Sequence, residues 1–175
     1  MSLLDNVLGN RWIALLFNPY HEPAGSSAGG QFTSSGDSVS EIGQALSKSF
    51  SEAGIDKIKS GNCWVFASAA YEKLKSAGET PKIIDWGGHV EAATKQGDSW
   101  LAYTPDGPTP FEKHWMTRVK KKVFRIYDSP SDLFKEILGD DGLLNANQQK
   151  IVFENLHKAE KIVGVKWQMP KPMRD

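Results

Sequence analysis

Apolar residues recur at helical spacing in two segments of the first half of the chain. In "SVSEIGQALSKSFSEAGI", which begins at residue 38, the pattern stops at Gly54 and its apolar positions are Ile42, Leu46 and Phe50. A second segment, from about Asn62 to Ala77 and closed by Gly78, repeats the spacing at Trp64, Ala67, Tyr71 and Leu74. Because residues three and four apart share one face of an α-helix, two amphipathic helices are predicted here.

Segments rich in β-branched and aromatic residues follow and predict strands: "PKIIDW" (81–86), "HVEAAT" (89–94), "SWLAYT" (99–104) and "RVKKKVFRIY" (118–127). The stretch "KQGD" at 95–98 is typical of a tight turn, so the second and third strands are predicted to form a hairpin. In the fourth, basic residues alternate with Val119, Val123 and Ile126, which indicates a solvated edge strand.

Two more helices are predicted near the end of the chain, in "SPSDLFKEIL" and "NANQQKIVFENLHKAEKI", the first capped by Ser129 or Ser131. An order of helices, an antiparallel sheet and further helices is typical of an α+β fold. The expected core includes Trp64, Phe66, Ala67, Leu74, Ile83, Val90, Leu101 and Val123.

The chain divides by composition into an arm, a linker, a domain and a tail. Residues 1–20 carry many large apolar side chains, whereas residues 21–37 are rich in Gly, Ser, Ala and Thr. Such a segment buries too little apolar surface to offset its ordering entropy, so it is predicted to be a linker. Residues 38–168 form the predicted domain and 169–175 a loose tail. Since the linker cannot cover the arm, we expect residues 1–36 to contact a neighbouring subunit.

Charge and cysteine content exclude several classes of protein. Lys plus Arg and Asp plus Glu each number 21, so the formal net charge is zero. Nucleic-acid-binding proteins usually carry a basic excess, so no nucleic-acid partner is expected. The apolar run "WIALLF" (12–17) is too short for a secretion signal or a membrane span, and neither is expected. A single cysteine excludes an intramolecular disulfide and suits a reducing compartment or an assembled particle.

That cysteine, Cys63, falls in the first turn of the second predicted helix. A helix N-terminus supplies partial positive charge and unpaired backbone N–H groups, which stabilise a thiolate and can bind an oxyanion. Free cysteines are also often just small buried residues. Position alone therefore leaves a nucleophile and a structural residue as equal alternatives.

A cysteine nucleophile needs a histidine as base and then as acid for the leaving group. His89 begins a predicted strand directly after two glycines, which allow close backbone approach. His21 lies in the linker, His157 lies on a late helix among charged residues, and His114 lies in a segment not assigned to any element. His89 is therefore the predicted partner of Cys63.

An acidic residue to orient the imidazole follows from the hairpin register. If Thr94 pairs with Ser99, His89 lies opposite Thr104, and Asp106 is its diagonal neighbour. A register shift of two residues would place Asp106 directly opposite. Asp106 is the predicted orienting residue, and Glu91, on the same face as His89, is the alternative.

The segment "GNCWVFASA" resembles the nucleophile helix of papain-like cysteine peptidases. It is more similar still to the transglutaminase-like branch of that superfamily, which includes short phage and bacterial proteins. "GGHVEAATKQGDSWLAYTPDG" resembles the second half of that family's site, with the order Cys63, His89, Asp106. The resemblance covers roughly residues 58–107. It implies a papain/transglutaminase-like fold, with the nucleophile helix packed on a small antiparallel sheet.

The resemblance also implies a function: a cysteine-dependent acyl-transfer hydrolase, either a peptidase or an amidase, acting on a protein or peptide without a metal or other cofactor. Papain-like enzymes place an oxyanion-hole glutamine six residues before the cysteine, where this chain has Lys57. Lys57 and Asn62 are the candidates to replace it, and Glu91 is a further auxiliary candidate. The alternative is a catalytically inactive structural or adaptor protein that keeps the fold.

The segment "AGSSAGGQFTSSG" resembles "GGQF"-type segments near the ends of phage head and virion-associated proteins. This resemblance implies a phage or prophage protein, located in the virion or the host cytoplasm. In the alternative function, the chain would be a component of the phage particle.

Overall fold

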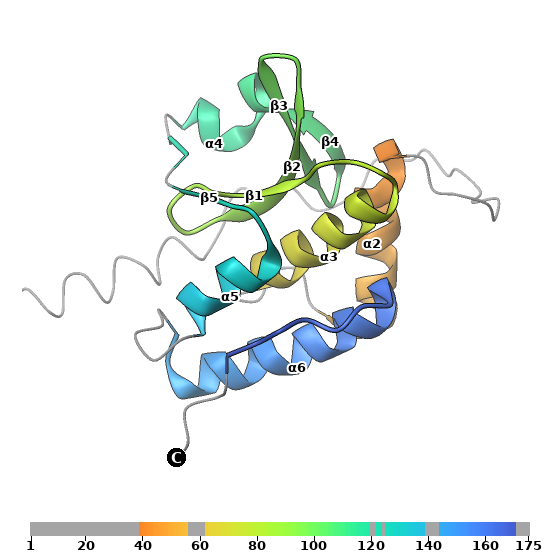
Figure 1. The fold of residues 1–175 in the computed structure, drawn as a ribbon, viewed down its shortest axis with the longest axis vertical. Helices are drawn as coiled ribbons and strands as arrows, with labels where there is room; N and C mark the ends of the chain where they lie inside the picture. Colours follow the sequence, from red (N-terminus) through yellow and green to blue (C-terminus); the bar gives the residue numbers. More distant parts are fainter. Residues whose placement is uncertain (1–38, 56–61, 120–121, 124, 139–143, 171–175) are drawn as a thin grey trace, which may run out of the picture.

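The computed structural model describes residues 39–55, 62–119, 122–123, 125–138 and 144–170. Figure 1 shows a sheet with three long helices, α2, α3 and α6, on one side of it. The arm (1–20), the linker (21–37), Lys57 and residues 171–175 lie outside the described residues. The elements are η1 (Val39–Glu41), α2 (Ile42–Glu52), α3 (Asn62–Ser76), β1 (Lys82–Asp85), β2 (Val90–Gln96), β3 (Ser99–Thr104), β4 (Gly107–Pro110), η2 (Phe111–Lys113), α4 (Trp115–Arg118), β5 (Arg125–Tyr127), α5 (Pro130–Ile137) and α6 (Ala146–Val163).

The strands form one antiparallel sheet in the order β4-β3-β2-β1-β5. β2 is central, and its side chains alternate between the two faces, as the period of a strand requires. Val90 and Ala92 belong to the main core on the helical side, whereas Ala93 belongs to a second apolar cluster. The predicted α+β class is confirmed.

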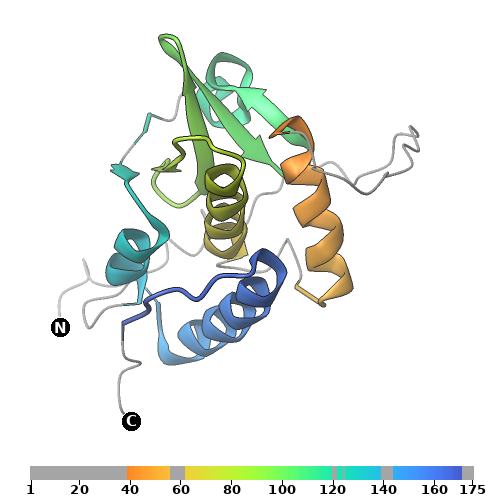
Figure 2. The same cartoon turned by 45° about the vertical axis from the view of Figure 1, so that its right-hand side comes forward.

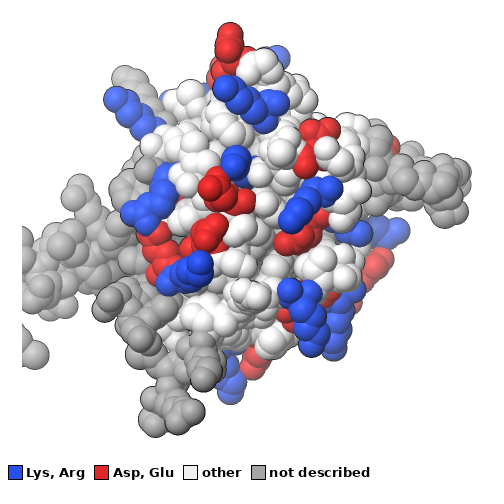
Figure 3. Space-filling view, in the orientation of Figure 1, with Lys and Arg blue, Asp and Glu red and all other residues white. Residues whose placement is uncertain are grey.

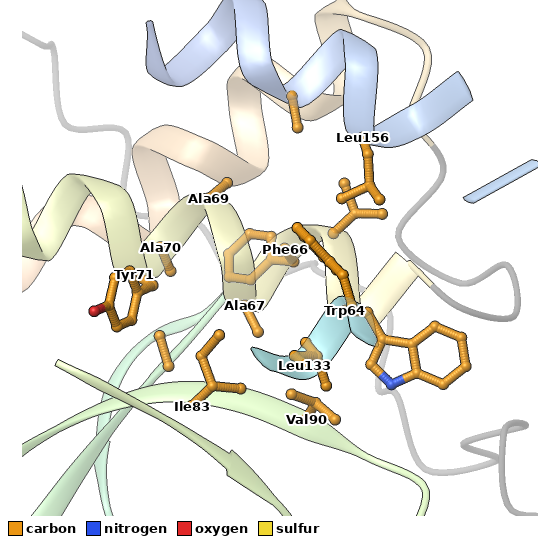
Figure 4. Close-up of a cluster of buried hydrophobic side chains, with 14 of the residues drawn as sticks. Trp64, Phe66, Ala67, Ala69, Ala70, Tyr71, Ile83, Val90, Leu133 and Leu156 are labelled. Carbon is orange, nitrogen blue, oxygen red and sulfur yellow. The ribbon is translucent and has the colours of Figure 1, made fainter. Parts of the chain in front are cut away.

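The main core lies between the sheet and α6, with α3 in the middle (Figures 1 and 2). Figure 4 shows Ala67 of α3 directed toward Ile83 and Val90 of the sheet. α3 is apolar over most of its circumference because it is covered on two sides, and ten of its residues are buried. Full burial of a large apolar side chain contributes roughly 1.5–3 kcal/mol, so this layer holds α3 firmly.

The opposite face of the sheet is covered by η2 and α4. Ile84, Trp86, Ala93 and Met116 are buried there, and Trp100, Phe111 and Trp115 pack around them partly buried. These aromatic residues come from the β1–β2 turn, from β3 and from the segment after β4. They bring that segment, including His114, back onto β2.

α6 begins and ends where its sequence indicates. Asn145 accepts a hydrogen bond from the N–H of Gln148, and the Gln148 side chain accepts one from the N–H of Asn145, which completes a capping box. α5 is capped by Ser129, the first of the two predicted serines, whose hydroxyl accepts from the N–H of Asp132. Both late helices form as predicted.

The strand predicted over 118–127 is wrong for most of its length. Arg118 is the last residue of α4, a helical turn capped by the His114 side chain, and among the described residues of 118–127 a strand forms at Arg125–Tyr127. Val119 is 53% exposed and Val123 38% exposed, so Val123 is not in the core as predicted. Leu101 is only partly buried, whereas the other six expected core residues are buried. β4, "GPTP", was not predicted, since proline is tolerated mainly in edge strands.

Charges of both signs are interspersed over the face seen in Figure 3, in keeping with the equal counts of acidic and basic residues. Lys82 pairs with Asp128 at 2.6 Å, and Arg125 pairs with Glu136. Exposed pairs of this kind contribute little to stability. Within the described ranges, no helix combines the length and apolar character needed to cross a membrane.

Candidate active site

Cys63 is the second residue of α3, as predicted, and is partly exposed. Its neighbour Trp64 is buried in the main core, which fixes the first turn of the helix and the direction of the cysteine. The first N–H groups of an α-helix have no partner within the helix and carry its positive dipole end. The sulfur therefore lies beside N–H groups that can bind an oxyanion.

His89 is held by a turn whose geometry depends on two glycines. The Asp85 carboxylate accepts hydrogen bonds from the N–H of Gly87 at 2.7 Å and of Gly88 at 3.3 Å. Gly87 has φ 76° and Gly88 φ 116°, and L side chains rarely adopt such values. The N–H of Trp86 donates to the His89 carbonyl at 2.8 Å and closes the turn. The sequence "DWGGH" thus sets the imidazole immediately before the first residue of β2.

The His89 ring lies between Cys63 and Glu91. Its Nε2 is 3.0 Å from Oε1 of Glu91, and the imidazole also interacts with the Cys63 side chain. Because Nε2 faces the carboxylate, Nδ1 is the nitrogen left for the sulfur. A thiol, an imidazole and a carboxylate are therefore connected in the order that nucleophilic catalysis by cysteine uses.

Glu91 is buried, with a side chain only 6% exposed, and it contacts a second imidazole. Nε2 of His114 lies 2.9 Å from Oε1 and 2.8 Å from Oε2 of the carboxylate, and the His114 side chain is 1% exposed. The N–H of Met116 donates to Nδ1 of His114 at 3.2 Å, so Nδ1 carries a lone pair. The ring proton is therefore on Nε2, and His114 donates it to Glu91.

These contacts shift the pKa values of both partners. Burial alone would lower the pKa of His89, but the Glu91 charge and hydrogen bonds with Cys63 and Glu91 raise it from 6.5 to about 10. Burial alone would raise the pKa of Glu91, but the His89 charge and the hydrogen bonds from His114 and His89 lower it from 4.5 to about 2. At neutral pH the site holds an imidazolium beside a carboxylate.

Aromatic rings shield this ion pair. Trp86 is stacked on His114 with ring centroids 5.4 Å apart and planes at 7°. Trp115 lies 5.3 Å from His89, measured between ring centroids, and Phe111 lies 6.5 Å from His114. Exclusion of water strengthens each charge–charge interaction beneath them. The His89 side chain remains 23% exposed, so it alone of the three groups in the ion-pair network is open to solvent.

Asp106 does not take the orienting position predicted for it. The hairpin pairs Thr94 with Leu101 rather than with Ser99, a register shift of two residues. If β2 and β3 continued to pair in this register, Asp106 would lie opposite His89. The chain turns first: β3 ends at Thr104, and Gly107 already pairs with Thr104 in β4. Asp106 is consequently exposed at a turn, with its N–H bonded to the Thr104 hydroxyl. Glu91, the alternative, contacts His89 instead.

The structure gives Asn62 a position different from the one expected of an oxyanion donor. Its side chain is buried, and its Oδ1 accepts a 2.8 Å hydrogen bond from Nδ2 of Asn155 on α6. This hydrogen bond joins the start of α3 to α6. The other candidate for this role, Lys57, lies outside the described residues.

His114 is the site residue that sequence analysis did not assign. It follows "FEK" in a segment without apolar periodicity, so no element was predicted there. The available signal was its position before "WM", because a polar residue before an apolar pair can cap a short helix. His157, which was assigned a surface role, is exposed and lies 2.9 Å from Glu160 on the same helix.

Comparison with known proteins finds no protein-family model, no curated protein and no solved structure that matches this chain. The functional assignment therefore rests on the geometry of the residues around Cys63.

Proposed function

We propose that the protein is a cysteine-dependent acyl-transfer hydrolase, a peptidase or amidase, in which Glu91 replaces Asp106 as the orienting acid. The observation that carries the proposal is the connected series Cys63, His89 and Glu91, which lies at the start of α3 and the start of β2. If Cys63 and His89 had only structural roles, the imidazole would not require a buried carboxylate next to it. Burying that carboxylate costs free energy that a role in the reaction explains.

The reaction would proceed in two acyl-transfer steps. The Cys63 thiolate attacks the carbonyl carbon of an amide, and N–H groups in the first turn of α3 stabilise the oxyanion. Protonated His89 then gives its proton to the leaving amine as the C–N bond breaks and a thioester remains. Neutral His89 next takes a proton from water, whose oxygen attacks the thioester and releases the acid and Cys63. Glu91 stabilises the imidazolium whenever His89 is protonated.

The proposal includes a papain/transglutaminase-like architecture for the domain. Its support is the packing of the nucleophile helix on an antiparallel sheet and the chain order of cysteine before histidine. In this chain, however, the histidine and the acid share one strand end, two residues apart. That departure makes Glu91 the residue to test.

Alkylation of Cys63 by iodoacetamide, followed by intact mass, tests the activation of the sulfur. We expect wild-type protein to react at pH 6, well below the free thiol pKa of about 8.5, and His89→Gln protein to react only near that value. Release of new N-termini from a peptide mixture, absent in Cys63→Ser, then tests hydrolysis. Equal reactivity of wild type and His89→Gln at every pH would support the inactive structural alternative.

A further inference from the structure

We propose that His114 is a positioning residue of this site, which holds Glu91 against His89 and extends the series to Cys63–His89–Glu91–His114. The inference rests on the proposed function for its catalytic consequence. Its structural basis is independent, because it concerns two imidazoles and one buried carboxylate. His114 reaches the site from the loop between β4 and α4, far from the other three residues in sequence.

The first supporting observation is that the imidazole rings of His89 and His114 both contact the same carboxylate oxygen of Glu91. Nε2 of His89 lies 3.0 Å from Oε1 of Glu91, and Nε2 of His114 is directed to the same oxygen at 2.9 Å. Within the described residues, Oε2 of Glu91 is buried and accepts no well-directed hydrogen bond. The orientation of the carboxylate therefore depends on Oε1, and His114 is the donor there that does not take part in proton transfer.

The fixed tautomer of His114 is the second observation. Its Nδ1 accepts the N–H of Met116, which commits the proton to Nε2 and makes the ring a permanent donor toward Glu91. The flat stack with Trp86, at 7° between planes, prevents the ring from turning over. Among the residues that the structure describes, the titratable groups facing Glu91 are His89 from the β1–β2 turn and His114 from the α4 cap, with Cys63 beyond His89.

Two roles of His114 are separable by substitution, because each ring nitrogen has its own partner. In His114→Asn the amide oxygen replaces Nδ1, which keeps the acceptor for Met116 but removes the donor to Glu91. In His114→Gln the amide nitrogen replaces Nε2, which keeps the donor to Glu91 but removes the cap. The two variants are therefore controls for each other.

The effect of each substitution is measured by NMR titration of the His89 ring and by the rate of Cys63 alkylation with iodoacetamide. We expect the His89 pKa of the His114→Gln protein to match that of wild type. In the His114→Asn protein, we expect the His89 pKa to fall from about 10 toward 6.5. Alkylation at pH 6 should slow roughly 10–100-fold in His114→Asn, the range typical for loss of an outer hydrogen-bond partner. If the His89 titration is unchanged in His114→Asn and only His114→Gln loses stability, His114 acts as a helix cap and the proposed positioning role is wrong.

A measurement on the wild-type protein covers the case in which neither variant folds. Nitrogen shifts of the His114 ring should show protonated Nε2 and unprotonated Nδ1 at neutral pH. A proton on Nδ1 would overturn the proposal. The His114 nitrogen shifts do not depend on whether Cys63 reacts, so they can also be recorded on Cys63→Ser protein. A failure of the proposed hydrolase, seen as an ordinary thiol in alkylation, remains distinct from a failure of the His114 assignment.

Discussion

Nε2 of His89 lies 3.0 Å from Oε1 of Glu91, although the two residues are separated by a single position in the chain. Side chains at positions i and i+2 of a strand share a face, so the pair forms without any contribution from a second strand. The imidazole and its carboxylate thus keep their relative positions even where the hairpin register differs from expectation. This local pairing is what makes Glu91, rather than Asp106, the acid of the site.

Glu91→Gln should therefore impair the proposed reaction much more than Asp106→Asn. Loss of the orienting charge should lower the rate of amide hydrolysis roughly 10²–10⁴-fold, as expected when a triad acid is neutralised. Asp106→Asn should retain the wild-type rate, because that carboxylate is exposed at the turn between β3 and β4. The rates of both variants are measured with one peptide substrate. A larger loss of rate in Asp106→Asn than in Glu91→Gln would contradict the assignment of Glu91 as the orienting acid.

The ion pair should also shape the pH dependence of stability. The His89 pKa rises from 6.5 to about 10, so its contribution is complete below pH 6.5 and disappears as the pH rises through 10. The Glu91 pKa falls from 4.5 to about 2, so its contribution is complete above pH 4.5 and disappears as the pH falls through 2. Together they favour the folded state most between pH 4.5 and 6.5.

Urea unfolding of wild type and Glu91→Gln across this pH range measures the contribution. The difference in the free energy of unfolding between them should be largest near pH 5.5 and shrink on both sides. Taking the difference removes the other titrating groups, which both proteins share. A difference that stays constant from pH 4 to pH 9 would contradict the ion pair.

Much of the helical layer and the position of Cys63 could be predicted from the sequence, because both depend on local patterns. Spacing of Ile42, Leu46 and Phe50 defines α2, and glycine stops end α2 and α3. The turn at 95–98 and the identity of β2 and β3 followed from alternation as well. These are features in which neighbours in the chain are also neighbours in space.

The position of Asp106 and the role of His114 could not be predicted, because they depend on how segments return to the sheet. The proline-rich segment "GPTP" lacks strand propensity, so the sequence does not predict β4 or the turn between β3 and β4 that exposes Asp106. His114 reaches Glu91 only because aromatic residues pack the η2–α4 segment onto the far face of β2. Such contacts follow from tertiary packing rather than from periodicity.

Gly43 of α2 should be intolerant of substitution. A Cβ atom there would collide with the carbonyl oxygen of Thr104 at the end of β3, and a backbone atom cannot move aside easily. Gly43→Ala should destabilise the fold by roughly 1–3 kcal/mol or more, despite the better helix propensity of alanine. The exposed neighbour provides the control: Gln44→Ala should change stability by less than about 0.5 kcal/mol. Thermal unfolding that ranks the two variants the other way would contradict this close approach.

The buried pair of Asn62 and Asn155 should hold the start of α3 on α6. Asn155→Leu removes the donor to Asn62 Oδ1 and should cost about 1–3 kcal/mol, because a buried acceptor loses its 2.8 Å partner. Since Asn62 precedes Cys63, alkylation of the sulfur should slow as well. Lys158→Ala, at an exposed position of the same helix, should alter neither quantity. If Asn155→Leu matches wild type in chemical denaturation, this bond contributes nothing to the position of Cys63.

The domain should fold without residues 1–36. The core of the described residues is closed by side chains between Ile42 and Trp167, and the Gly- and Ser-rich segment 21–37 offers few apolar groups to it. The apolar residues of the arm would each gain roughly 1.5–3 kcal/mol by burial, which a neighbouring subunit can provide. We therefore expect the protein lacking residues 1–36 to keep its melting temperature and its Cys63 alkylation rate, while it loses association with that neighbour in a co-sedimentation assay. A drop of several degrees in melting temperature would instead assign the arm to the core of its own chain.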